Sequence, residues 1–285
     1  MIRLLTAVVA LAGAAQAADA PKRYPAEVFF NTTDYFAAGA VTAFSPDSSK
    51  LLISSNATGV FNAYALDVKT GAQAPLTSSA TDATFAVGYF PKDERILFTA
   101  DKGGDELNHL FVRELDGTVK DLTPGDNLKA IFGGWIGDGE AFFAFTNERD
   151  ARFFDLYRYD SADYSRTLVF KNDAGFSIDA TNRQGTRAAA VKERTSADNN
   201  IFLIDLTAPE AEPLLVTPHE GNISHSVHDF TADGTKLVFG TDEHGEFAQA
   251  WTFDIASGEK APLIEAAWDV MYVLYSPSGR YCVSA

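Results

Sequence analysis

The segment His225-Ser-Val-His-Asp229 holds the densest group of side chains that could bind a metal ion or carry a proton. Imidazole nitrogens and carboxylate oxygens are ordinary ligands of zinc. The flanking residues alternate as in a β-strand, however, and successive side chains of a strand point to opposite faces. We therefore expect His225 and His228 to face apart, with His225 and Asp229 on one face. The segment predicts a structural strand and no metal site.

Two acidic loops could offer oxygen ligands to calcium: Asp101-Lys-Gly-Gly-Asp-Glu106 and Asp242-Glu-His-Gly-Glu246. Neither loop has the spacing of an EF-hand, and aspartate and glycine are also the residues that tight turns require. We predict solvated turns that bind no metal. Their negative charge offers, as a weaker hypothesis, an attraction for the cationic ends of peptides.

Nucleophilic catalysis has no candidate in this sequence. There is no G-x-S-x-G motif, the turn that exposes the nucleophile of α/β-hydrolases. His109 stands in no serine or cysteine nucleophile context, so we expect a strand residue with a local hydrogen bond. The chain is predicted to have no catalytic, no cofactor-binding and no metal-binding residue, and to hydrolyse nothing by itself.

Five other acidic residues recur at intervals of 45 to 49 positions. They are Asp67, Glu114, Asp160, Asp205 and Asp254. An aromatic residue stands three positions before each of them. Because they repeat so regularly, we predict that these carboxylates cap strand ends or turns and catalyse no reaction.

A second pattern holds the same period: a polar turn that precedes an apolar strand and, in five of its six copies, begins with an aromatic residue. Its members are Phe44-Ser-Pro-Asp-Ser48, Tyr89-Phe-Pro-Lys-Asp93, Trp135-Ile-Gly-Asp-Gly139, Thr181-Asn-Arg-Gln-Gly185, Phe230-Thr-Ala-Asp-Gly234 and Tyr275-Ser-Pro-Ser-Gly279. Proline presets φ, aspartate bonds to its own backbone and glycine tolerates positive φ, so each member is a tight turn. Two marker series with one period indicate a tandem repeat of about 46 residues.

Each repeat contains four predicted strands. An inner strand such as His225–Phe230 leads through the polar turn to a second strand, Lys236-Leu-Val-Phe-Gly240 in this repeat. A loop precedes the aromatic third strand, and a short outer strand ends near Pro262-Leu-Ile264. No stretch of ten residues has helical spacing. Four antiparallel strands per repeat make one blade, so we predict an all-β propeller of five complete blades and a partial sixth.

The first residues have the layout of a secretory signal peptide. Arg3 precedes an apolar run, and the small residues Ala15-Gln-Ala17 end the segment. We assign residues 1–17 to the signal, 18–38 to an N-terminal segment and 39–285 to an incomplete propeller. The mature chain is expected to be exported to the periplasm or the extracellular space, without a membrane span.

Composition excludes further classes. The single cysteine, Cys282, rules out a disulfide framework. A net charge of −16 without a basic cluster argues against nucleic acid and anionic membranes as partners. With 46% hydrophobic residues, the chain has ample material for a core.

The chain resembles the amino-terminal propeller of the prolyl oligopeptidase family of serine peptidases, in particular the dipeptidyl and acylaminoacyl peptidase group. The likeness runs from Glu27 to the last residue. The segments that carry it are Phe29-Phe-Asn-Thr-Thr-Asp-Tyr-Phe36, Phe44-Ser-Pro-Asp47, Ser54-Ser-Asn-Ala-Thr-Gly-Val-Phe-Asn62, Gly104-Asp-Glu-Leu-Asn-His-Leu110, Asp121-Leu-Thr-Pro-Gly125 and Thr146-Asn-Glu-Arg-Asp150. The resemblance implies a propeller of seven or eight blades on an α/β-hydrolase domain, which admits short peptides and excludes folded proteins.

The sequence departs from that family in having no hydrolase domain and no recognisable paired-glutamate motif for a substrate's amino terminus. Our leading interpretation is the non-catalytic, substrate-gating propeller of an exported peptidase. Its partners would be peptide substrates and the α/β-hydrolase domain of a parent protein. The sixth repeat stops in its second strand, so we expect a fragment that closes poorly and aggregates easily.

Two alternatives belong to other classes. A TolB-like periplasmic propeller would bind protein partners, but the first blade begins about 20 residues after the signal and leaves no room for the domain that precedes such propellers. A sugar-active propeller enzyme would need a carboxylate cluster in its channel from non-equivalent positions, and the sequence suggests none.

Overall fold

The computed structural model describes residues 22–39, 42–276 and 278–285. The predicted signal peptide, residues 1–17, lies outside the described residues. Within the described ranges, no helix is long and apolar enough to cross a membrane.

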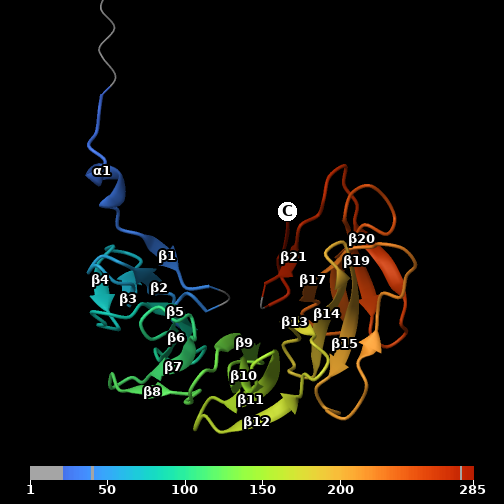
Figure 1. Cartoon of the computed structure of the whole chain (residues 1–285), viewed down its shortest axis with the longest axis horizontal. Coiled ribbons are helices and arrows are strands. Elements are labelled where there is room, and N and C mark those ends of the chain that lie inside the picture. Colours follow the sequence, from blue (N-terminus) through green and yellow to red (C-terminus); the bar gives the residue numbers. More distant parts are fainter. Residues whose placement is uncertain (1–21, 40–41, 277) are drawn as a thin grey trace, which may run out of the picture. The chain divides into compact units, whose positions relative to one another are not determined.

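The chain divides into two compact units, Met1–Thr33 and Asp34–Ala285. The described part of the first unit contains a single turn of helix, α1 (Glu27–Phe30). All the described strands belong to the second unit. There the sheets succeed one another around a shared centre (Figure 1).

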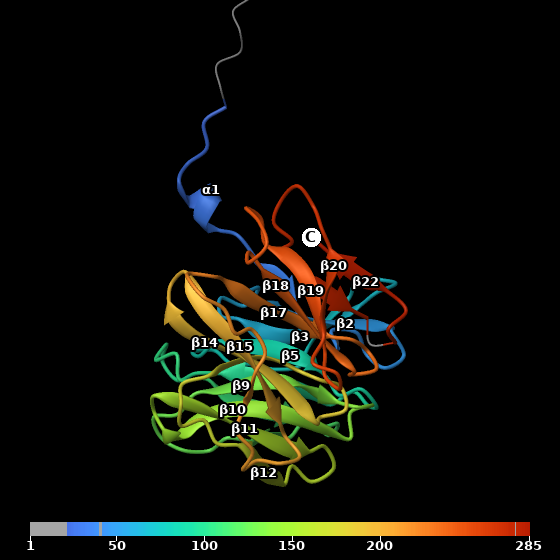
Figure 2. The ribbon, with the colours of Figure 1, turned by 90° about the vertical axis from the view of Figure 1, so that its right-hand side faces the viewer.

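Five sheets of the second unit have four antiparallel strands each, hydrogen-bonded in the order in which they follow along the chain. The first sheet contains β1 (Tyr35–Ala37), β2 (Lys50–Ser55), β3 (Asn62–Asp67) and β4 (Gln73–Pro75). The second contains β5 (Thr84–Tyr89), β6 (Ile96–Ala100), β7 (His109–Arg113) and β8 (Val119–Asp121). The third contains β9 (Ala130–Ile136), β10 (Ala141–Asp150), β11 (Phe153–Asp160) and β12 (Arg166–Phe170), which Figure 2 shows side by side in this order.

The remaining sheets continue the pattern. The fourth contains β13 (Ser177–Thr181), β14 (Arg187–Thr195), β15 (Asp198–Asp205) and β16 (Leu214–Leu215). The fifth contains β17 (His225–Phe230), β18 (Lys236–Thr241), β19 (Gln249–Asp254) and β20 (Lys260–Ile264). A sixth sheet has two strands, β21 (Val273–Tyr275) and β22 (Cys282–Ser284). The predicted succession of inner, second, third and outer strands is confirmed, and β1 lies within the segment that we assigned to residues 18–38.

Neighbouring sheets share layers of apolar side chains. Five buried clusters each draw their residues from two consecutive sheets. In β10, Phe142 and Ala144 pack toward the second sheet, whereas Phe143 packs toward the fourth. A strand covered on both faces explains the unbroken apolar run Ala141–Phe145. Stacking buries the second face of each sheet, which one repeat cannot do alone.

The periodic carboxylates cap turns as predicted, with one exception. Asp67 accepts hydrogen bonds from the backbone N–H groups of Lys69 and Thr70 at 3.1 and 2.7 Å. Asp160, Asp205 and Asp254 accept equivalent bonds. Glu114 does not; it accepts a bond from the Tyr164 hydroxyl at 2.6 Å. Asp116 caps that turn, because the shorter side chain reaches the Thr118 N–H at 2.9 Å.

The inner strands of the second to fifth sheets each contain a β-bulge at an equivalent place in the repeat. The register skips one residue in each strand: Val87, Gly133, Asp179 and His228. A bulge adds one residue to a strand and re-aims the side chains around it. These four positions therefore break the alternation that sequence patterns assume.

Candidate functional site

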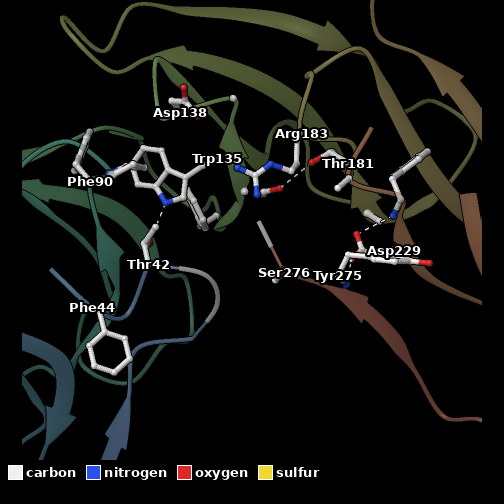
Figure 3. A pocket seen from close by; sticks show the side chains of 18 of the residues that line it. Thr42, Phe44, Phe90, Trp135, Asp138, Thr181, Arg183, Asp229, Tyr275 and Ser276 are labelled. Carbon is white, nitrogen blue, oxygen red and sulfur yellow. Dashed lines mark hydrogen bonds between the residues drawn. The ribbon is translucent and has the colours of Figure 1, made fainter. Parts of the chain in front are cut away.

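A cavity of about 620 Å³ lies where the inner strands and their polar turns converge (Figure 3). All six sheets contribute to its lining. Three of the four bulged residues, Gly133, Asp179 and His228, are among the lining residues. The repeat thus brings side chains from distant parts of the chain to one hollow.

One wall of the cavity is aromatic. Phe90, Phe132 and Trp135 come from the second and third sheets, and the Trp135 ring lies 4.9 Å from that of Phe90 and 5.4 Å from that of Phe132. Figure 3 shows Phe90 and Trp135 together on one side. Such edge-on packing fixes the rings and leaves an apolar surface facing the hollow.

The opposite wall is polar and comes from the fourth to sixth sheets. It contains Asp179, Thr181, Arg183, His228 and Asp229. Burial raises the pKa of Asp179 and of Asp229, and it lowers the pKa of His228. This wall therefore combines carboxylates that surrounding protein desolvates with a neutral imidazole.

Asp229 has a structural role in that wall. Its Oδ1 accepts a hydrogen bond from the Phe230 N–H at 2.7 Å, and its Oδ2 accepts one from the Tyr275 N–H at 2.8 Å. The second bond joins the fifth sheet to the sixth. Both oxygens are engaged, so Asp229 is the less available of the two carboxylates.

Hydrogen bonds between sheets hold the lining in place. The Trp135 indole donates to the Thr42 hydroxyl at 3.0 Å, which ties the third sheet to the first turn. The Gly137 N–H donates to the Arg183 carbonyl at 2.6 Å, and the Thr181 hydroxyl donates to a carbonyl of the third sheet at 3.4 Å. These bonds connect the parts of the lining that come from the first, third and fourth sheets.

The histidine segment is placed differently from the prediction in one respect. His225 is buried away from the cavity, with its Nδ1 3.0 Å from the Asn199 carbonyl oxygen. The His228 ring lies 3.1 Å from the Ser226 hydroxyl and lines the cavity, so the two histidines face apart as expected. The expectation that His225 and Asp229 share a face is wrong, because the bulge at His228 turns Asp229 to the cavity.

The other predicted residues lie outside the cavity. His109 lies in β7 and its Nδ1 is 2.8 Å from an oxygen of Asp121, the local bond that we expected. The two acidic loops connect the second and third strands of their sheets. Among the described residues, no group of three or more His, Cys, Asp or Glu side chains is arranged to hold a metal ion.

Sequence reasoning missed the carboxylates that line the cavity. Asp138, Asp179 and Asp229 line one cavity from non-equivalent positions of the repeat, whereas we expected no such gathering of carboxylates. Asp179 stands two residues before the first residue of its polar turn, as Gly133 and His228 do in theirs. Aligning the repeats at that position would have shown that Val87 and Gly133 of the second and third sheets are replaced by the ionisable Asp179 and His228 in the fourth and fifth.

Comparison with known proteins gives one clear relative by sequence. A dipeptidyl aminopeptidase BIII from Pseudoxanthomonas mexicana is 31% identical over 232 residues, which are 78% of this chain and 33% of that protein. No family model matches the chain. The chain thus spans about a third of the length of this curated relative.

Two solved structures illustrate the fold. An oligogalacturonate lyase in complex with manganese has a TM-score of 0.64 at 17% identity, and the match covers 87% of this chain and 70% of that one. A prolyl endopeptidase has a TM-score of 0.63 at 12% identity, with coverage of 86% and 39%. At such low identities these likenesses concern the fold alone.

Radially stacked four-stranded sheets around a lined hollow define a β-propeller, the class that the sequence predicted. The homology to a dipeptidyl aminopeptidase then confirms the resemblance of this propeller to the prolyl oligopeptidase family of serine peptidases.

Proposed function

We propose that the chain is the substrate-gating, non-catalytic propeller of an exported serine peptidase of the prolyl oligopeptidase type. The observation that carries the proposal is the lined cavity at the centre of a propeller homologous to part of a dipeptidyl aminopeptidase. Peptide substrates and an α/β-hydrolase domain would be its partners.

The dimensions of the cavity support a gating role. A hollow of about 620 Å³ lies within the range of sites that enclose small ligands. A short peptide segment fits such a space, whereas a folded domain does not. The hydrogen bonds that join the first, third and fourth sheets stabilise this part of the lining.

The secretory layout of residues 1–17 supports export. Fusing this segment to a reporter enzyme that is active only after export tests this part of the proposal. Activity with the native segment, and its loss when Leu4 and Leu5 are replaced by aspartate, is the expected result. Equal activity of both fusions would contradict it.

Hydrolysis supplies the main test. The purified chain is expected to leave aminoacyl and prolyl reporter substrates intact, because it carries no nucleophile elbow. Coding DNA after Ala285 is expected to contain a G-x-S-x-G motif followed by aspartate and histidine. If that DNA instead completes the propeller without a hydrolase, a TolB-like interaction propeller becomes the better proposal. Activity of the chain alone would overturn the non-catalytic role.

A further inference from the structure

We propose that the central cavity binds a peptide through a cationic side chain, a lysine ammonium or an arginine guanidinium, which pairs with Asp179. An apolar residue next to the cation would rest on the aromatic wall. The peptide character of the ligand rests on the proposed function, whereas the cation site rests on the residues described below.

Asp179 is aimed at the cavity by the bulge of β13. Its side chain is accessible because the cavity is hollow, yet the surrounding walls desolvate it. The hydrogen bond that it accepts comes from the hydroxyl of Ser177, two residues away, at 2.8 Å. A carboxylate in such a place gains most from a ligand that brings a positive charge.

The basic side chains that line the cavity, Lys92 and Arg183, form no ion pair with Asp179 in the described part of the chain. Lys92 pairs with Glu140, outside the cavity's polar wall. Burial raises the pKa of Asp229 and the charge of Arg183 offsets only part of that rise, whereas Arg183 has no such effect on Asp179. Burial keeps His228 neutral. In the described part of the chain, Asp179 has no basic group within ion-pair distance.

The two walls set the chemistry that a ligand must offer. The aromatic wall of Phe90, Phe132 and Trp135 takes apolar groups, and it lies across the hollow from the polar wall of the fourth to sixth sheets. Aromatic faces also favour the aliphatic stem and the charged head of a basic side chain. A peptide with an apolar residue next to a basic one matches both walls at once.

The test is a titration of the full chain with capped peptides, in which calorimetry measures binding and tryptophan fluorescence, to which Trp135 in the cavity wall contributes, reports it independently. The probes are acetyl-Phe-Lys-Ala-amide, acetyl-Phe-Arg-Ala-amide and the uncharged acetyl-Phe-Gln-Ala-amide. A charge-assisted pair predicts that the lysine and arginine peptides bind about tenfold more tightly than the glutamine peptide. The two basic probes show whether the site prefers an ammonium or a guanidinium.

Two variants locate the site. Asp179→Asn is expected to abolish the advantage of the basic peptides while leaving the binding of the glutamine peptide unchanged. Glu210→Gln removes the same charge from an exposed loop of the fourth sheet, outside the cavity, and is expected to keep the advantage. Thermal melting of both variants checks that they are folded.

Each result has one meaning. Equal affinity of basic and uncharged peptides for the unmodified chain would overturn the cation site and leave the gating proposal standing. An advantage that survives Asp179→Asn would place the cation elsewhere and also overturn it. Failure of all three peptides to bind would contradict both proposals.

Discussion

Asp179 and Asp229 both line the cavity, but Asp179 is exposed to the hollow whereas Asp229 is half-buried, and their carboxylates can do different things. Both carboxylate oxygens of Asp229 accept hydrogen bonds from backbone N–H groups, whereas Asp179 accepts one hydrogen bond, from the Ser177 hydroxyl. At the scale of single residues, the number of free acceptor sites therefore separates the two roles. Asp229 joins two sheets, whereas Asp179 can still accept a hydrogen bond from a ligand.

Replacing Asp179 should reveal the cost of keeping its charge in the cavity. The raised pKa means that the folded state holds the proton more tightly than the unfolded state, so stability falls as pH rises through the raised pKa. Asp179→Asn carries no such penalty and should melt at a slightly higher temperature at neutral pH. The gain should vanish at a pH below the ordinary range of aspartate.

Melting curves across pH measure this difference, with Glu210→Gln as the charge-matched control. A variant Asp179→Asn that melts below the unmodified chain at every pH would mean that the carboxylate stabilises the fold.

Removing Asp229 should loosen the boundary between the fifth and sixth sheets. Asp229→Ala deprives two N–H groups, of Phe230 and Tyr275, of their acceptor, which costs about 1–3 kcal/mol of the free energy of unfolding. Asp229→Asn keeps a single carbonyl oxygen and should lose less. Amide hydrogen exchange should quicken at Tyr275 in Asp229→Ala, and unchanged exchange there would contradict the bonding role.

At the scale of elements, β10 shows why the sequence was informative. The repeat predicted a strand here, and the structure shows that this strand is buried on both faces, with Phe142 and Phe143 both 0% exposed. Phe142→Ala and Phe143→Ala should each lower the free energy of unfolding by about 3–5 kcal/mol, because each leaves a cavity in a buried layer. The two residues belong to different layers, so each loss reports on one layer. Denaturant unfolding measures both losses.

Leu168→Ala in the neighbouring β12 is the matched control, since Leu168 is 39% exposed and should change stability by about 0.5 kcal/mol or less. An equal loss in the control would contradict the stacked arrangement. Additive losses in the double variant at positions 142 and 143 would fit residues that lie on opposite faces.

The period, the strand order and the capping aspartates could be predicted because each repeats in the sequence. The bulges could not, since one extra residue inside a strand leaves turn signals and apolar content unchanged. That single residue at His228 moved Asp229 to the cavity. The carboxylates of the cavity were missed because Asp138, Asp179 and Asp229 line one hollow without sharing a position in the repeat.

At the scale of the whole second unit, the sixth sheet differs from the other five. It has two strands, and Leu274 and Val283 are exposed on them, as is Tyr281 directly before β22. The outer edge of β22 has no hydrogen-bonded strand among the described residues. Unpaired edges with apolar side chains favour association.

Purified chain should therefore associate as its concentration rises, which light scattering after size-exclusion chromatography measures. Val283→Lys places a charge on the edge strand and should shift the population toward monomer. Lys260→Gln, in the outer strand of the fifth sheet, should not. A chain that stays monomeric at high concentration would refute this expectation.

The sharing of each apolar layer by two consecutive sheets also bears on how such a molecule changes over generations. Every internal boundary is of the same kind, so gaining or losing one repeat unit preserves the boundaries that remain. Gene duplication can then change the number of sheets, and with it the width of the central hollow, without redesigning any single layer.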